Sequence, residues 1–183
     1  SGEVEQEMVD LEDGLRGLSD PGLAMKKAWP EDWDSSGIEI HEGLLEFDAV
    51  VCGALRSDFQ RTRLEMMCER LGVHSFSPLW HNSPDRHMEN LYRHGFDVRI
   101  ASVSCEGLGA EWLGARIGND EVERLQALSR RYRFNVDGEG GEFETLVLGA
   151  PHMERSIEAI GEVAWEGSRG VWNVNSARLT PVR

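Results

Sequence analysis

The sequence AVVCGAL, residues 49–55, is a continuous apolar run that has neither a helical nor an alternating period. Such a run is typical of a strand that is buried on both faces of a parallel sheet. Ser57 or Asp58 follows as a helix cap, and the apolar stripe of that helix leads to an expected end at Gly72. A second short strand is expected over 73–79. This strand–helix–strand order predicts an α/β fold for the first part of the chain.

Outward from this unit, the pattern predicts further helices and then a strand-rich end. The expected elements are a helix over 4–18, an insertion region at about 19–46, a short helix over 39–47, a helix over 83–95, a strand over 96–104, a helix capped by Asn119 or Asp120, and strands over 145–148, 157–165 and 171–179. Residues 166–170 separate the last two strands and predict a hairpin turn.

The composition limits the classes of function. The chain has 183 residues and a formal net charge of −14, which disfavours non-specific binding to nucleic acid because phosphate contacts require clustered Lys and Arg. No apolar run approaches the ~20 residues of a membrane span, and no basic, apolar signal segment opens the chain. A soluble, cytoplasmic protein with no nucleic-acid or membrane partner is expected.

The cysteines and histidines do not predict a metal site. Cys52, Cys68 and Cys105 are odd in number and show no CxxC pairing, so buried free thiols are expected. A group of histidines is spaced by six and seven residues, whereas helical metal ligands prefer three or four. These histidines are His81, His87 and His94.

The sequence GEGGEFETLVL, residues 138–148, is the clearest candidate for a functional loop. Its glycines allow tight turns and the close approach of a ligand. Glu139, Glu142 and Glu144 would repel one another unless a cation, an amine or hydrogen-bond donors held them together. The alternative is a solvated acidic turn.

A second candidate site follows the apolar run at 49–55. Gly53 lies near its carboxyl end, where open α/β sheets bind ligands. Arg61 and Arg63 lie at the start of the next helix, where positive charge opposes the helix dipole unless an anion is near. The alternative is an exposed helix with an ion pair between Arg61 and Glu65. Glu106 follows a strand end, where it serves either a ligand or the local backbone.

Four segments in the same order resemble one known family. They are GALRSDFQRTRLEMMCERLGV at 53–73, PLW at 78–80, EGLGAEWLG at 106–114 and GEGGEFETLVLGAP at 138–151. The series is similar to the diphthine–ammonia ligases, which are ATP pyrophosphatases of the adenine-nucleotide α-hydrolase type. The resemblance implies a Rossmann-like α/β portion over 1–95 and a smaller α+β substrate domain over 96–183.

The resemblance also implies an activity. Family members use ATP and Mg²⁺ to convert the carboxylate of diphthine, on elongation factor 2, into an amide with ammonium. They begin with a phosphate-binding loop of the form SGGKDS, which this sequence lacks. The chain is therefore expected to be a C-terminal piece, one subunit of a split enzyme whose partner chain carries the nucleotide loop, or a non-catalytic binding module; a homo-oligomer is another alternative. A related ATP pyrophosphatase with another substrate is a further alternative.

The family motifs imply roles for individual residues. Glu139, Glu142 and Glu144 are the expected catalytic residues. The nucleotide is expected to contact Gly53, Ala54, Ser57, Gln60, Arg61 and Arg63. The substrate is expected to contact Trp80, Glu106, Trp112, Gly140, Gly141 and Thr145. An acidic, partly aromatic pocket suits the trimethylammonium group of diphthine, and arginines suit the charge that develops on phosphorus.

Overall fold

The computed structural model describes residues 2–18 and 43–181. The chain divides into two compact units, Ser1–His81 and Asn82–Arg183, which are described here separately as the first unit and the second unit. Most of the predicted insertion at 19–46, and residues 39–42 of the short helix predicted there, lie outside the described residues. Residues 43–47 are not helical, so the prediction is wrong for that part, where Gly43 adopts a left-handed φ of 89° that interrupts a helix.

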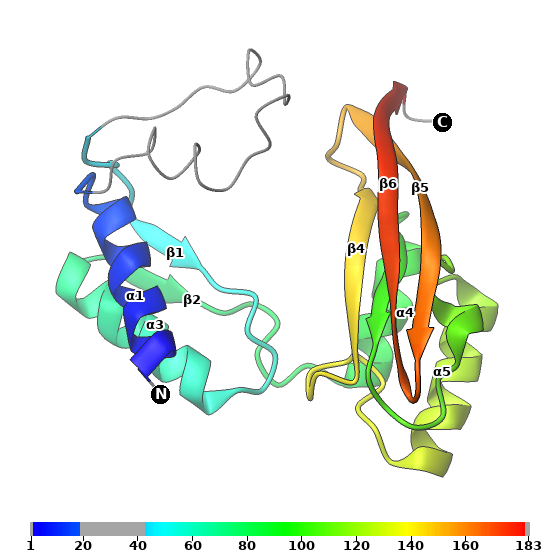
Figure 1. Ribbon diagram of the computed structural model, residues 1–183. Coiled ribbons are helices and arrows are strands. Elements are labelled where there is room, and N and C mark those ends of the chain that lie inside the picture. The colour runs from blue at the N-terminus through cyan, green and yellow to red at the C-terminus, as the bar shows by residue number, and fades with distance from the viewer. Residues whose placement is uncertain (1, 19–42, 182–183) are drawn as a thin grey trace. The chain divides into compact units, whose positions relative to one another are not determined.

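The first unit has the predicted strand–helix–strand order (Figure 1). Its elements are α1 (Gly2–Leu15), β1 (Ala49–Val51), α3 (Asp58–Leu71) and β2 (His74–Phe76). Strands β1 and β2 pair in parallel, with α3 as the connection between them. Ser57 Oγ accepts a hydrogen bond from the backbone N–H of Gln60 at 3.3 Å, and Gly72 ends the helix with a φ of 72°. Both predicted ends of α3 are confirmed.

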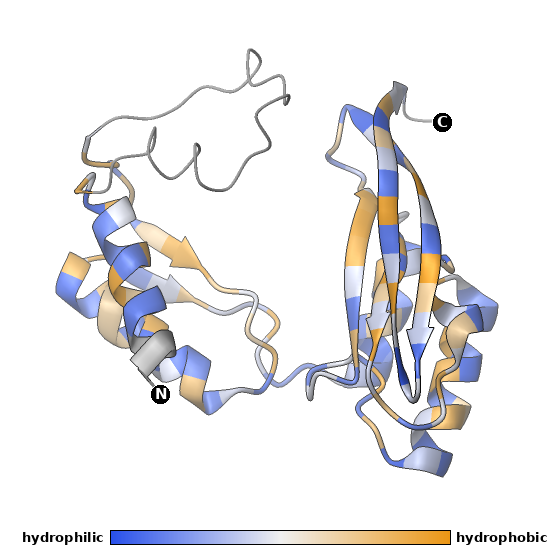
Figure 2. Ribbon diagram, viewed as in Figure 1, coloured by the Kyte–Doolittle hydropathy of each residue, from blue (hydrophilic) through white to orange (hydrophobic). Residues whose placement is uncertain are grey.

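The prediction that residues 49–55 form a strand buried on both faces is wrong. Strand β1 spans only three residues, and the side chains of Val51 and Phe76 are 68% and 58% exposed. Figure 2 shows β1 as a hydrophobic strand, although Cys52 beyond its end is the residue that is buried. A parallel sheet buries such residues only where layers cover both of its faces. The two described strands have too few neighbours for that.

Helices α1 and α3 are joined by ion pairs in the first unit. The carboxylate of Glu12 lies 2.6 Å from Arg70 of α3 and 2.9 Å from Arg16, which directly follows α1. Hydrogen bonds from Arg70 and then from Arg16 hold the pKa of Glu12 below its ordinary value. The Glu12–Arg70 ion pair therefore links the two helices.

The second unit contains a mixed α and β layer structure (Figure 1). Its elements are α4 (Pro84–Arg93), β3 (Asp97–Val103), the short 3-10 helix η1 (Ala110–Trp112), α5 (Asn119–Tyr132), β4 (Phe143–Gly149), β5 (Arg155–Glu166) and β6 (Arg169–Pro181). The strands form an antiparallel sheet in the order β4-β3-β6-β5. The predicted helices and strands of this region are confirmed.

The capping residue of α5 differs from the prediction of Asn119 or Asp120. Gly118 is the N-cap, and its backbone N–H donates to Glu121 Oε2 at 3.1 Å. The side chain of Glu121, at the third helical position, accepts the hydrogen bond from the backbone N–H of the cap residue. This bond needs no polar side chain at the cap, so glycine can occupy it.

The core of the second unit lies between its helices and one face of the sheet. Its buried side chains come from both helices, from β3 and β4, and from the loops between them. They are Met88, Val98, Ile100, Val103, Leu108, Trp112, Leu113, Ile117, Val122, Leu125, Phe134, Val136 and Phe143. Because Met88 of α4 belongs to this core, α4 packs with the second unit. The functional division predicted after residue 95 stays a prediction.

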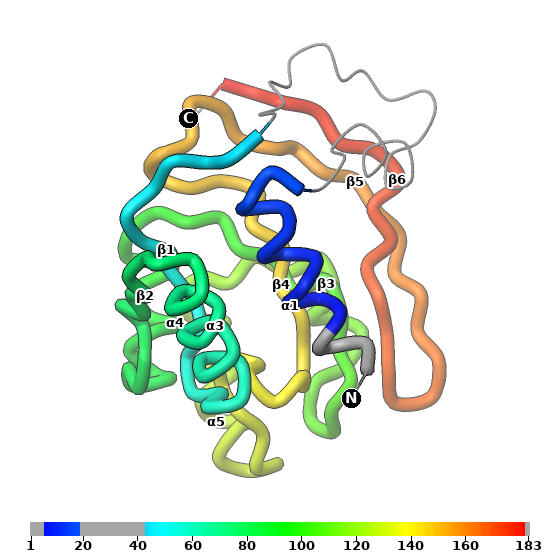
Figure 3. The backbone as a smooth tube through the Cα atoms, turned by 90° about the vertical axis from the view of Figure 1, so that its left-hand side faces the viewer, coloured from blue at the N-terminus to red at the C-terminus, as the bar shows by residue number. Residues whose placement is uncertain are grey.

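Strands β5 and β6 form the predicted hairpin, and Figure 3 shows them side by side along their length. The hairpin joins the rest of the sheet through a short segment, in which Val171 pairs with Ser102 and Gly170 with Val103. Beyond that segment Leu179 is 62% exposed. The loop over residues 135–142 leads instead into the β4-β3 pair, which contributes Val98, Ile100 and Phe143 to the core.

The described residues contain neither a membrane-spanning helix nor a metal-binding cluster. No helix in the described ranges is long and apolar enough to cross a bilayer. No three His, Cys, Asp or Glu side chains within residues 2–18 and 43–181 are grouped so that they could hold a metal ion. The predicted free thiols are confirmed: Cys52 and Cys68 are buried and Cys105 is partly buried.

Candidate functional site

The acidic loop, residues 135–142, connects the region after α5 to strand β4. Gly138 and Gly141 adopt left-handed φ values of 74° and 80°, which glycine tolerates best. The N–H of Gly138 donates to the carbonyl of Asn135 at 3.0 Å, and the N–H of Gly141 donates to the carbonyl of Gly138 at 2.9 Å. Two consecutive turns therefore fold this loop back on itself.

The carboxylate of Glu142 lies inside these turns. Its Oε1 atom accepts hydrogen bonds from the backbone N–H and the side-chain amide of Asn135, each at 2.8 Å. Its Oε2 atom accepts from the backbone N–H of Gly140 at 2.8 Å. The hydrogen-bond donors that the sequence required for an acidic cluster are thus supplied, for Glu142, by the loop itself.

The acidic loop is also tied to the end of β3. The backbone N–H of Ser104 donates to the carbonyl of Glu142 at 2.8 Å, and Ser104 Oγ donates to the carbonyl of Gly141. Burial, then the nearby charge of Glu142, raises the pKa of the Cys105 thiol, against a backbone hydrogen bond at Leu108 that lowers it. Sequence reasoning missed Asn135, which the turns of the loop bring to Glu142, and Ser104, which the pairing of β3 with β4 brings to the loop.

The other two glutamates of the motif lie on either side of Glu142 in the sequence. Glu139 is partly buried, and its backbone N–H lies 3.5 Å from Asp137 Oδ1. Glu144 is exposed on β4, where it pairs with Ser102. Thr145 follows it and is also exposed.

Glu106 lies at the same end of the sheet as the acidic loop. It follows β3, and the pairing of Val103 with Phe143 places the end of β3 beside the start of β4. Its side chain is exposed. The structure thus brings Glu106 to the same sheet end as the residues of the acidic loop.

Trp112 has a different position from the other predicted substrate residues. Its side chain is 1% exposed and belongs to the core of the second unit. The guanidinium of Arg124 lies over the indole, 4.7 Å from the ring centroid. Within the described residues, the Nε1 atom of Trp112 has no hydrogen-bond partner. The side chain is therefore enclosed by the core and is not accessible for direct contact with a ligand.

The residues predicted to contact a nucleotide all lie in the first unit. Gly53 is exposed, and a Cβ atom added to it would meet no atom within 4 Å. The backbone N–H of Ala54 donates to Cys52 Sγ at 3.4 Å. Ser57 and Gln60 form the cap of α3 described above. These residues trace one continuous segment from the end of β1 into the first turn of α3.

Arg61 of this segment contacts Trp80. Its guanidinium lies 4.6 Å from the centroid of the Trp80 ring, and Trp80 stacks on His81 with centroids 4.7 Å apart. Arg61 Nε also lies 2.7 Å from Glu65 Oε1, which confirms the ion pair that the spacing offered as an alternative. The structure therefore joins a predicted nucleotide residue to a predicted substrate residue within the first unit.

Arg63 points to a different ring. Its guanidinium lies 3.3 Å from the centroid of Phe59, one turn earlier in α3. The two arginines thus lie over separate aromatic side chains, and both residues are partly exposed.

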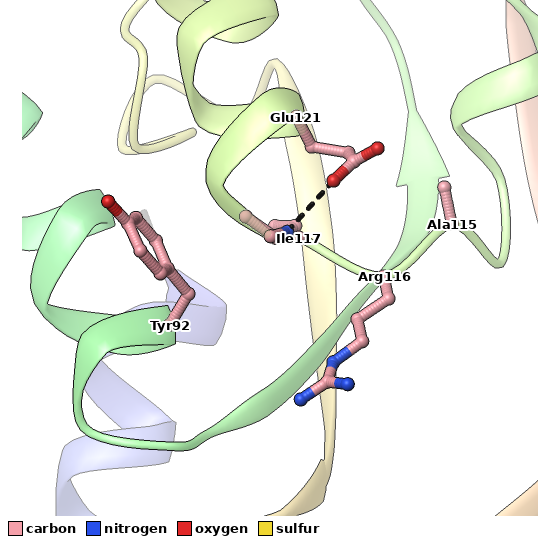
Figure 4. A pocket seen from close by; sticks show the side chains of 6 residues that line it. Tyr92, Ala115, Arg116, Ile117 and Glu121 are labelled. Carbon is pink, nitrogen blue, oxygen red and sulfur yellow. Dashed lines mark hydrogen bonds between the residues drawn. The ribbon is translucent and has the colours of Figure 1, made fainter.

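A shallow pocket of about 410 Å³ lies elsewhere in the second unit (Figure 4). It is lined by Tyr92, Ala115, Arg116, Ile117, Gly118 and Glu121. The hydrogen bond from Gly118 to Glu121 that caps α5 forms part of its wall. None of the site residues predicted from the sequence lines this pocket. The acidic loop, where three hydrogen bonds hold one carboxylate, is therefore the stronger candidate site.

The comparisons with known proteins identify the family. Residues 83–180 match the model of the diphthamide synthase C-terminal domain. The second unit is thus a domain of the kind found in diphthamide synthases. The chain belongs to the diphthamide synthase C-terminal domain family.

Relatives of the chain carry the name diphthine–ammonia ligase. The chain is 33% identical over 125 residues to the Schizosaccharomyces pombe protein, covering 68% of this chain and 20% of that relative. It is 36% identical over 130 residues to the Saccharomyces cerevisiae protein, covering 63% and 19%. With the Rattus norvegicus protein the identity is 34% over 113 residues, covering 61% and 42%. The chain therefore spans less than half the length of each of these relatives, and the family resemblance predicted from the sequence is confirmed.

Proposed function

We propose that this chain carries the substrate side of an ATP-dependent diphthine–ammonia ligase. The observation that carries the proposal is the acidic loop, an ordered turn rich in carboxylates within the domain that matches the family. In the proposed reaction the carboxylate of diphthine on elongation factor 2 attacks the α-phosphorus of ATP. An acyl-adenylate forms and pyrophosphate leaves. Ammonia then attacks the acyl carbon, a proton is lost and AMP is released with the amide.

The acidic residues suit a positively charged substrate. Diphthine carries a fixed trimethylammonium group, and ammonium is the source of the new amide nitrogen. Carboxylates attract both cations electrostatically. We assign this role to Glu139, Glu142 and Glu144 as a group, with removal of the proton from the attacking ammonia by one of them. Gly140 and Gly141 let the substrate approach the backbone.

Other predicted substrate contacts lie around this loop or in the first unit. Glu106 and Thr145 are proposed to contact the substrate from the end of β3 and from β4, since both side chains are exposed. Trp80 is proposed to offer an aromatic face. For Trp112, which is enclosed, we propose support of the segment between β3 and α5 in place of a direct contact.

The nucleotide side is proposed for the first unit. Arg61 and Arg63 would place positive charge near the phosphates, and Gly53, Ala54, Ser57 and Gln60 would provide the backbone at the carboxyl end of β1. Mg²⁺ is bound mainly by phosphates and one or two carboxylates, so we assign it to the nucleotide half of the enzyme. ATP supplies the activated phosphorus, and Mg²⁺ neutralises its charge.

The fold of the first unit is proposed to be part of a Rossmann-like sheet of the adenine-nucleotide α-hydrolase type. The parallel β1-α3-β2 unit supports this proposal, because exposed apolar residues on a short parallel sheet are typical of a portion of a larger one. The SGGKDS loop would then come from another segment or from a different partner chain, since this sequence does not contain it. In this scheme residues 1–95 serve the nucleotide and residues 96–183 serve the substrate.

Mass spectrometry of elongation factor 2 tests the proposed reaction. Cells that lack this protein should accumulate diphthine in place of diphthamide, and return of the gene should restore the amide. Restoration by a Glu139→Gln/Glu144→Gln variant would remove the acidic group from the proposal. Normal diphthamide in the deleted cells would contradict the proposed substrate and favour a related ATP pyrophosphatase.

A non-catalytic binding module is the second candidate, favoured by the lack of an SGGKDS motif in the sequence. Calorimetry with ATP separates the two. The ligase proposal expects ATP to bind when the chain is combined with a nucleotide-binding half and more weakly when the chain is alone. Absence of binding in both preparations would favour the module.

A further inference from the structure

The three glutamates of the motif do not have equivalent surroundings. Both oxygens of Glu142 point into the acidic loop, where they accept three N–H hydrogen bonds from Asn135 and Gly140. The backbone on either side of Glu142 is fixed as well, because Ser104 bonds the carbonyls of Gly141 and Glu142. Glu144 is exposed on the first part of β4 instead. The carboxylate of Glu142 is thus already engaged by its own loop.

The glycine at position 140 is required by this arrangement. A Cβ atom at Gly140 would lie 2.7 Å from Glu142 Oε1 and 2.8 Å from Asn135 Nδ2. Real Cβ atoms do not approach polar atoms this closely, so the carboxylate and the amide would have to move. Gly140 therefore has a steric role, which is to let the carboxylate of Glu142 reach the backbone.

We infer that Glu142 is a positioning residue, which with Asn135 fixes the acidic loop so that Glu139 and Glu144 face the cationic substrate. This inference rests on the proposed function for what the loop binds, whereas the structural part concerns the loop alone. Hydrogen bonds from a carboxylate to several N–H groups hold a turn in one conformation without further contacts. Glu139 lies within the turns that Glu142 closes, and Glu144 follows two residues later on β4.

The structural part is tested by amide hydrogen exchange measured by NMR on the whole chain. Glu142→Gln replaces an oxygen by an NH₂ group, which opposes an N–H donor on one side of the carboxylate. The amides of Asn135 and Gly140 should then lose protection, and Asn135→Ala should produce a smaller loss at Gly140. Glu144→Gln, which lies outside the loop, is the matched control and should leave both amides protected.

The functional part is tested by the kinetics of amidation. If Glu142 acts through the residues that bind the cation, its loss weakens cation binding equally in the ground state and in the transition state. The KM for ammonium should then rise, while kcat should stay unchanged. We expect kcat/KM to fall roughly 10²-fold for Glu142→Gln, the scale of a misplaced group, and less for Asn135→Ala. Both falls should occur through KM.

The outcomes separate this inference from the proposed function. Protected amides in Glu142→Gln would overturn the positioning role, whatever the activity. A fall in kcat with unchanged KM, together with an intact loop, would make Glu142 the proton acceptor and would also overturn it. If the wild-type chain shows no amidation in any preparation, the proposed function fails, and the exchange data still decide the structural role. Should Glu142→Gln fail to fold, Asn135→Ala keeps the test open.

Discussion

The two units differ in how much of their apolar surface they bury. In the second unit two helices cover one face of an antiparallel sheet, and the buried cluster includes Trp112, Ile100 and Leu125. Among the described residues of the first unit, the buried hydrophobic side chains are Cys52, Met67 and Cys68. Two short parallel strands and their helices cannot enclose a larger core. The chain thus contains one well-packed domain and one unit whose apolar sheet surface is largely exposed.

The same difference separates the two candidate sites. The acidic loop extends from the well-packed β4-β3 pair and is fixed by its own hydrogen bonds. The segment after β1 belongs to the unit with the smaller core. Segments with few buried contacts open most readily. We therefore expect the proposed substrate side to be preorganised and the proposed nucleotide side to change more readily with temperature and denaturant.

The largest expected effect is that of Trp112→Ala, which tests the difference in core packing between the two units. Removing a fully buried tryptophan leaves a cavity and should cost about 3–5 kcal/mol of the free energy of unfolding. Exchange of the β3 amides in rising denaturant measures that loss in the second unit. Trp80→Ala, which removes a partly buried ring from the first unit, is the control and should cost less. Equal losses would contradict the difference in packing.

A smaller effect is expected when alanine replaces glycine in each unit. Gly140→Ala displaces the Glu142 carboxylate and the Asn135 amide and should destabilise the second unit by about 1 kcal/mol, because their hydrogen bonds weaken. Gly53→Ala meets no atom within 4 Å and should change stability by about 0.5 kcal/mol or less. Thermal unfolding of the matched pair measures both. A neutral Gly140→Ala would mean that the loop adapts without cost.

The ion pairs of Glu12 predict a pH dependence confined to the first unit. Because the folded-state pKa of Glu12 is lowered, its stabilisation is complete above the ordinary value of 4.5 and is lost as pH falls through the folded value. Glu12→Gln should remove this acid-dependent part. Amide exchange in α3 below and above pH 4.5 checks it. An unchanged acid profile in the variant would contradict the role of Glu12, and the β3 amides serve as the internal control.

The smallest expected effect is on the reactivity of Cys105. Burial is the main cause of its raised pKa and the charge of Glu142 the second, so Glu142→Gln should lower that pKa while leaving it above the ordinary value of 9.0. Alkylation followed by peptide mass spectrometry should therefore be modestly faster at alkaline pH. Asn135→Ala perturbs the loop but keeps the charge. It should leave the rate nearer to that of the wild type, and equal acceleration in both variants would assign the effect to loop opening.

Local chemistry made much of the fold predictable. The cap at Ser57 and the stop at Gly72 depend on residues a few positions apart, so the sequence was sufficient to place α3. The hairpin of β5 and β6 was predictable for the same reason, since its turn and its strands are contiguous. The glycines and carboxylates of 138–148 likewise identified a candidate loop before its geometry was known.

Contacts between distant residues were not predictable in this way. An apolar run such as residues 49–55 predicts a strand that favours burial. Whether Val51 is covered depends on how many helices and strands pack around that strand. The sequence around Trp112 does not distinguish a buried tryptophan from an exposed one that contacts a ligand. The burial of its side chain depends on packing against residues of β3 and α5.

The sequence by itself determined the family, the order of helices and strands, and the acidic loop, because these depend on residue type, spacing and short-range backbone preference. The tertiary structure decided how the Glu142 carboxylate is held. Asn135 and Ser104 approach Glu142 only because left-handed glycines fold the loop and because β3 pairs with β4. Hydrogen bonds need atoms within about 3 Å of each other, and that proximity is a property of the folded chain.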